Sequence, residues 1–130
     1  MRLLTILVPA YNEQDSLPLL AERLRPVIAK LRPQVECEVI VLDNCSQDRT
    51  REVALALCAK DPAWRYVRYS KNFGYHGSLA CGFDIARGDA LVVLASDLQE
   101  PPELLPTLVE HWLKGADVAY GVLDKRHRDR

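Results

Sequence analysis

The chain has 130 residues, a formal net charge of −1 and a hydrophobic fraction of 48%, values typical of one globular domain. The small net charge gives no reason to expect nucleic acid as a partner, and the apolar runs are far shorter than the roughly 20 residues of a membrane-spanning helix. The four cysteines form no C-x-x-C pair, so we expect free thiols and a cytoplasmic protein.

Short strand-like runs alternate with helical periods along the chain. The expected elements are a strand at 3–8, a helix from Asp15 or Ser16 to about residue 31, a strand at 38–43, a helix at 51–59, a strand at 65–69, a helix at 77–86, a strand at 90–95, a helix between Pro101 and Gly115, and a short strand at 117–120. Pro26 is expected to kink or split the first helix. The alternation predicts an α/β fold of doubly wound type, with a mainly parallel sheet, helices on both faces, and the first and fourth strands adjacent.

The segments that follow the four principal strands are all polar. They are residues 9–13, 43–48, 70–77 and 96–100, whereas the returns from helix to strand look like plain turns. In an open parallel sheet, ligands bind beyond the carboxyl ends of the strands. We therefore expect these four exit segments to form one binding site.

The residue types in the exit segments suit a nucleoside diphosphate. Asp43 and Asn44 can pair with a base or a ribose, and the glycines of the third segment let backbone amides approach a phosphate. Asp97, with Gln99 or Glu100, offers the hard oxygen ligands that Mg²⁺ and Mn²⁺ prefer. Any one of these carboxylates could instead cap the next helix, but four polar segments at one edge favour binding.

Four stretches resemble, in order and spacing, the family 2 glycosyltransferases of GT-A fold. They are VPAYNEQDSLP, VLDNCSQDRT, KNFGYHGSLACGFDIARGD and ASDLQEPPELLP. The similarity covers residues 3–121 and is strongest to the polyprenyl-phosphate subgroup, which includes dolichol-phosphate mannosyltransferase and bacterial undecaprenyl-phosphate sugar transferases. The resemblance implies transfer of a sugar, with inversion, from a UDP- or GDP-linked donor to a polyprenyl phosphate at the inner face of a membrane, with Mg²⁺ or Mn²⁺ on the diphosphate.

The resemblance also implies roles for particular residues, although it assigns no catalytic one. The residues expected at the nucleotide are Pro9, Tyr11, Asn12, Glu13, Asp43, Asn44, Asn72, Gly74 and Asp97. Asp97 would bind the metal, assisted by Gln99. Tyr11 could lie against the base.

Three positions depart from the family pattern. Asn44 stands where the family usually has the second of two adjacent acids, and Ala95 stands at the first position of its D-x-D element. Tyr75 replaces a lysine that is common after N-F-G. We expect the missing carboxylate at position 95 to weaken nucleotide or metal binding by about 1–3 kcal/mol.

Residues 1–121 are predicted to form a GT-A nucleotide-sugar-binding domain, and residues 122–130 a charged tail that begins an acceptor region. The chain would then be the N-terminal, nucleotide-binding half of such an enzyme, and we expect little turnover from it alone. Because Asn44 and Ala95 depart from the family pattern, a second hypothesis is a non-catalytic paralogue that binds a nucleotide or a partner. A phospho-receiver domain is a third hypothesis, disfavoured because Glu13 is the only acid in the first exit segment. Homo-oligomerisation stays open.

Overall fold

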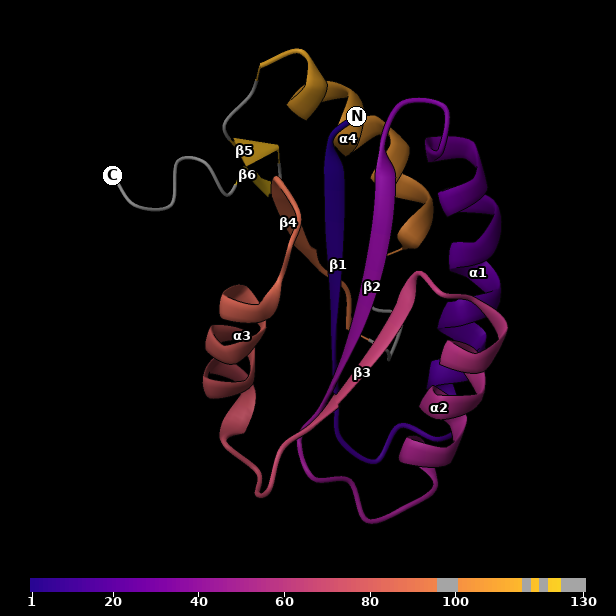
Figure 1. The fold of residues 1–130 in the computed structure, drawn as a ribbon, viewed down its shortest axis with the longest axis vertical. Coiled ribbons are helices and arrows are strands. Elements are labelled where there is room, and N and C mark those ends of the chain that lie inside the picture. The colour runs from indigo at the N-terminus through magenta and orange to yellow at the C-terminus, as the bar shows by residue number, and fades with distance from the viewer. Residues whose placement is uncertain (96–100, 116–117, 120–121, 125–130) are drawn as a thin grey trace.

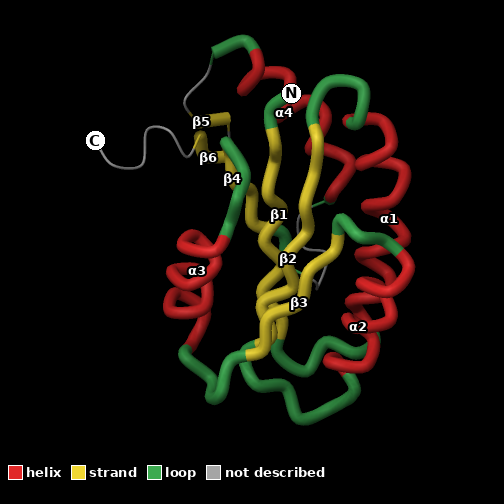
Figure 2. Tube along the Cα trace, viewed as in Figure 1, coloured by secondary structure: helices red, strands yellow, loops and turns green. Residues whose placement is uncertain are grey.

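The computed structural model describes residues 1–95, 101–115, 118–119 and 122–124. Its strands are β1 (Leu3–Ala10), β2 (Glu36–Asp43), β3 (Trp64–Arg68), β4 (Ala90–Val93), β5 (Val118–Ala119) and β6 (Val122–Asp124). Its helices are α1 (Ser16–Leu31), α2 (Thr50–Lys60), α3 (Gly74–Ile85) and α4 (Leu105–Leu113), with a 3₁₀ turn, η1 (Pro102–Leu104), before α4. Figures 1 and 2 show these elements around one twisted sheet.

The sheet has the strand order β3-β2-β1-β4-β6-β5. β1 pairs in parallel with both β2 and β4, so that Ile6 lies between Val39 and Val92. β6 pairs antiparallel with β4 and with β5. The prediction of a mainly parallel sheet with the first and fourth strands adjacent is confirmed.

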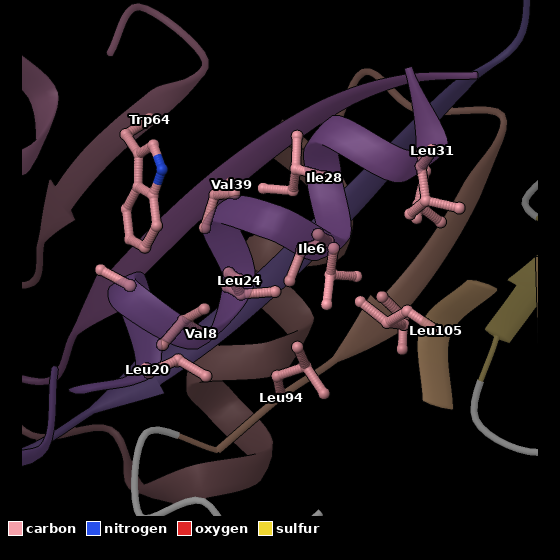
Figure 3. Close-up of a cluster of buried hydrophobic side chains, with 14 of the residues drawn as sticks. Ile6, Val8, Leu20, Leu24, Ile28, Leu31, Val39, Trp64, Leu94 and Leu105 are labelled. Carbon is pink, nitrogen blue, oxygen red and sulfur yellow. The ribbon is translucent and has the colours of Figure 1, made fainter. Parts of the chain in front are cut away.

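Apolar side chains of the central strands alternate between two cores, because successive residues of a strand point to opposite faces. Ile6 and Val8 belong to the larger core under α1, α2 and α4, part of which is drawn in Figure 3. Leu7 belongs to the smaller core under α3. The sheet is therefore covered on both faces, which explains why β1 reads as a nearly continuous apolar run.

α3 packs closely against the sheet through Gly82. A Cβ atom at this position would lie 2.6 Å from Cδ1 of Leu42 and 3.3 Å from Cδ1 of Leu7. The lack of a side chain therefore brings α3 close to β1 and β2. The N-terminus of α3 is thereby held beside the ends of these strands.

The expected split at Pro26 is wrong, because α1 is one continuous helix with Pro26 inside it, and the kink stays a prediction. Proline has no N–H, so the carbonyl of Glu22, one turn earlier, lacks its helical hydrogen-bond partner. Pro26 and Glu22 both lie on the exposed side of α1. Leu24 and Ile28 are buried on the other side. Burial on either side of Pro26 offsets the roughly 3 kcal/mol that an interior proline costs.

Most boundaries differ from those expected by one or two residues, and two differences are larger. α3 begins at Gly74, three residues before the predicted start, because the Asn44 amide accepts from the N–H of Phe73 and donates to the carbonyl of Gly74, which fixes the backbone there. Residues 122–124, assigned to the charged tail, pair with β4 as strand β6. The wider division into a nucleotide-binding domain and the start of an acceptor region stays a prediction. Within the described ranges, no helix is both long and apolar enough to cross a membrane.

The return turn at 87–89 is not a plain turn, because it is joined to a buried polar network. The Glu38 carboxylate accepts hydrogen bonds from Thr5 Oγ1 at 2.5 Å and from the backbone N–H of Arg87 at 2.8 Å. Arg65 Nη1 lies 2.9 Å from the same carboxylate. Thr5 Oγ1 in turn accepts from the N–H of Gly88 at 2.8 Å. The network ties β1, β2 and β3 to the turn before β4, at the edge opposite the exit segments.

Candidate functional site

The exit segments of β1, β2 and β3 meet at one edge of the sheet, at the lower end of Figure 1. They surround a pocket of about 350 Å³, large enough for a small-molecule ligand. The pocket is lined by Pro9, Ala10, Tyr11, Glu13, Asn44, Asn72, Gly74, Tyr75 and Ala95. Six of the nine predicted nucleotide-binding residues are among them: Pro9, Tyr11, Glu13, Asn44, Asn72 and Gly74. With Ala95, which follows β4, four separate stretches of sequence contribute to one cavity.

Asn12 joins the first exit segment to the second and does not line the pocket. Its backbone is in the left-handed region, with φ 53°, which asparagine tolerates better than most residues. Its Oδ1 accepts a hydrogen bond from the N–H of Gln47 at 2.8 Å, and its own N–H donates to Ser46 Oγ at 2.9 Å. Asn12 therefore holds two segments together, and its predicted contact with the nucleotide stays a prediction.

Thr50, the last residue of VLDNCSQDRT, has no role expected from the sequence, and it positions the backbone of Glu13. Its buried Oγ1 accepts from the N–H of Glu13 at 2.8 Å and donates to Asp48 Oδ1 at 2.5 Å. Desolvation acts to raise the pKa of Asp48, but hydrogen bonds from Thr50 and Gln14 outweigh it, and the pKa is lowered. The D-x-T spacing at the start of α2 is the signal that could have identified this residue.

Asp43 ends β2 with a fully buried carboxylate that protein donors surround. Oδ1 accepts from the N–H of Ser46 at 2.8 Å. Oδ2 accepts from the Tyr66 hydroxyl and lies 3.4 Å from Nη1 of Arg68. Burial, followed by the hydrogen bond to Asp43, raises the pKa of Tyr66 to about 12. Asp43 does not line the pocket, so its expected pairing with a base or ribose stays a prediction.

Asn44 forms a two-way link between the second and third exit segments. Its Oδ1 accepts from the N–H of Phe73 at 2.9 Å, and its Nδ2 donates to the carbonyl of Gly74 at 3.1 Å. A carboxylate could make the first contact but could not donate the second. Gly74 has φ +77°, and its N–H donates to Asn72 Oδ1 at 2.8 Å. The Asn44 amide thus fixes the start of α3 beside the pocket.

The rim of the pocket is aromatic and carries little charge. Tyr11 is 44% exposed and Tyr75 is 53% exposed, and both line the cavity. Glu13 is the acidic lining residue, and Ser16 Oγ donates to its Oε2 at 2.6 Å. The described part of the lining contains no basic side chain. This arrangement suits a flat, uncharged group with polar edges.

The predicted metal ligands, Asp97 and Gln99, lie outside the described residues, as does Glu100. Among the residues that the structure does describe, no group of three or more His, Cys, Asp or Glu side chains could hold a metal ion. Ala95, just before this segment, lines the pocket. The metal site therefore stays a prediction.

Similarity to known proteins extends over almost the whole chain. The model of Glycosyl transferase family 2 matches residues 5–130. The bactoprenol glucosyl transferase of Shigella phage SfV is 32% identical over 126 residues, which are 97% of this chain and 40% of that protein. The undecaprenyl-phosphate 4-deoxy-4-formamido-L-arabinose transferase of Pseudomonas paraeruginosa is 36% identical over 125 residues, which are 95% of this chain and 36% of the relative.

A solved structure supports the same assignment. Glucosyl-3-phosphoglycerate synthase from Mycobacterium tuberculosis, in complex with Mn²⁺, UDP and phosphoglyceric acid, is similar with a TM-score of 0.67 and 26% identity, over 88% of this chain and 40% of that one. The chain thus spans about two fifths of the length of these proteins. The predicted α/β fold of GT-A type is confirmed. The chain belongs to glycosyl transferase family 2.

Proposed function

We propose that the pocket between the exit segments binds a nucleotide-diphosphate sugar, UDP- or GDP-linked, as the donor half of a glycosyltransferase. One observation carries the proposal: six predicted nucleotide-binding residues from three exit segments line one pocket beyond the carboxyl ends of parallel strands. The UDP named in the complex of the M. tuberculosis enzyme supports a nucleotide as the ligand.

The proposed acceptor is a polyprenyl phosphate, with inversion at the sugar. Support comes from two relatives, named as a bactoprenol and an undecaprenyl-phosphate transferase. A phosphate monoester is already charged near neutral pH, so its oxygen can attack the anomeric carbon without a strong general base. A single attack from the side opposite the diphosphate inverts the configuration. Such an acceptor would place the whole protein at the cytoplasmic face of a membrane.

Asp97 and Gln99 are the proposed holders of Mg²⁺ or Mn²⁺. Carboxylate and amide oxygens suit either ion, and the Mn²⁺ named for the M. tuberculosis structure is consistent with this choice. When bound, the ion would supply positive charge against the leaving nucleoside diphosphate. The described residues contribute differently, because Asn44 and Thr50 hold the exit segments in place around the pocket.

Thermal denaturation with UDP, GDP, TDP and CDP, each with and without Mn²⁺, tests the proposal. Ligand at about 100 times its Kd should add about 2.7 kcal/mol, a rise in Tm on the order of 10 °C. We expect a rise that depends on the base and on the metal. Asp97→Asn should remove the metal dependence, whereas Glu22→Gln, on the exposed side of α1, should not. A flat response across the whole panel would refute donor binding.

Ala95 favours a second candidate, a nucleotide-binding module without catalytic activity. It lines the pocket at the position where the family usually has an acid. This hypothesis predicts nucleotide binding that is independent of Mn²⁺, and metal dependence that returns in an Ala95→Asp variant. Metal-dependent binding by the unchanged chain would exclude it. Membership of family 2 leaves the phospho-receiver hypothesis without support.

A further inference from the structure

Tyr75 is an exposed aromatic residue at the edge of the pocket. It is the second residue of α3, it is 53% exposed, and it lines the pocket together with Tyr11 from the first exit segment. Large exposed aromatic side chains in a cavity are typical of ligand contacts. The family resemblance offers no role for it, because a lysine is common at this position.

The position of Tyr75 is fixed by the surrounding backbone. Gly74, just before it, is held on both sides, its carbonyl by Asn44 Nδ2 and its N–H by Asn72 Oδ1. The ring of Tyr75 packs edge-to-face on His76, with centroids 5.7 Å apart and an interplanar angle of 78°. The backbone that carries Tyr75 is therefore held before any ligand arrives, which lowers the entropic cost of a contact.

Phe73 provides a contrast two residues earlier. It is 47% exposed, but its ring packs edge-to-face on Tyr69 at 5.8 Å and lies 5.1 Å from the Lys71 ammonium. It is not among the lining residues of the pocket. Of these two neighbouring aromatic rings, Tyr75 is the one presented to the cavity.

The chemistry of the lining identifies the part of the ligand that Tyr75 can contact. No basic side chain is found among the described lining residues, so this part of the pocket does not favour a diphosphate. The rings of Tyr11 and Tyr75 suit a flat, uncharged ring, and the Asn72 amide nitrogen can donate to a polar edge of it. A nucleobase has these properties.

We propose that Tyr75 forms an aromatic wall of the base subsite and stacks against the nucleobase of the donor. A lysine at this position would present a positive charge instead of this aromatic ring. The inference rests on the proposed nucleotide binding and names the part of the nucleotide that this wall recognises. It predicts that Tyr75 contributes to base affinity and not to diphosphate affinity.

Titration calorimetry with UDP, GDP and their nucleosides, and separately with pyrophosphate plus Mn²⁺, tests the assignment. Tyr75→Ala should weaken nucleotide and nucleoside binding about tenfold and leave pyrophosphate unchanged. Tyr75→Phe should stay within about twofold of the unchanged chain, because the ring is kept. Tyr75→Lys should weaken nucleosides as Tyr75→Ala does, yet tighten pyrophosphate. Phe73→Ala is the matched control, with nucleotide affinity unchanged.

Proton NMR of the bound nucleotide reports stacking directly. Base protons should shift upfield on binding to the unchanged chain and to Tyr75→Phe, and this ring-current shift should shrink in Tyr75→Ala. If Tyr75→Ala binds nucleosides with full affinity, or loses as much affinity for pyrophosphate as for nucleosides, the inference is overturned while the proposed function is left intact. Absence of binding by the unchanged chain to any of the nucleotides would refute both.

Discussion

A methyl group added at Gly88 should destabilise the fold without touching the pocket. A Cβ atom at this position would lie 2.5 Å from Oγ1 of Thr5, 2.7 Å from the backbone N of Thr5 and 2.8 Å from the carbonyl O of Ala90. The last two atoms belong to the backbones of β1 and β4, which pair in the centre of the sheet and cannot move aside independently. Gly88→Ala must therefore displace the turn itself.

The expected cost combines overpacking with a lost hydrogen bond. Forcing a methyl group into a packed site costs about 1–3 kcal/mol. Displacing the turn also weakens the bond from the Gly88 N–H to Thr5 Oγ1, a loss of about 1 kcal/mol. The sum, about 2–4 kcal/mol, is a large fraction of the roughly 5–15 kcal/mol by which domains are stable.

Urea denaturation followed by circular dichroism measures this cost. Gly88→Ala should lower the free energy of unfolding by about 2–4 kcal/mol with little change in m-value. Gly77→Ala is the control: at this half-buried position of α3 the Cβ would approach Cβ of Phe73 at 3.1 Å, so Phe73 must shift by a few tenths of an ångström, and a gain of up to about 1 kcal/mol in helix propensity opposes that cost. A Gly88→Ala variant within about 0.5 kcal/mol of the unchanged chain would refute the argument from close contact. Nucleotide affinity of the folded variant should be unchanged.

Three further predictions concern buried polar groups. Burial acts to raise the pKa of Glu38, but its hydrogen bonds outweigh burial and lower the pKa below the ordinary 4.5. The ionised carboxylate therefore stabilises the fold above about pH 4.5, and this stabilisation is lost as the pH falls through the pKa of Glu38 in the folded state. Urea denaturation across pH should show that Glu38→Gln flattens this loss. Tyr66→Phe removes a donor to the buried Asp43 carboxylate, so the free energy of unfolding should fall by about 1–3 kcal/mol, and spectrophotometric titration should lose the tyrosine whose pKa is about 12. Asn44→Ala removes both the acceptor of the Phe73 N–H and the donor to the Gly74 carbonyl, so hydrogen exchange of the Phe73 amide should accelerate about tenfold; exchange at the original rate would contradict the two-way link.

The helix-forming and strand-forming patterns predicted the element order well, but not every boundary. Leu17, Leu20 and Leu24 keep helical spacing, and all are buried in α1. Pro26 was misjudged, because its cost depends on whether the freed carbonyl faces water, which a local pattern does not reveal. The early start of α3 was missed because the contacts of Asn44 at Phe73 and Gly74 span about 30 residues along the chain.

The sequence by itself determined that polar exit segments gather at one edge of a parallel sheet, because strand direction and alternation follow from short-range hydrophobic periodicity. Only the tertiary structure decided which polar side chains face the pocket and which hold the segments together. Asn44 lines the pocket and also links two segments, whereas the side chain of Asn12 accepts from the N–H of Gln47 in the second exit segment and does not line the pocket. A given side chain carries the same hydrogen-bonding groups whether it faces a ligand or holds two segments together. Which of the two it does depends on the distant backbone groups that the fold brings within about 3 Å of it.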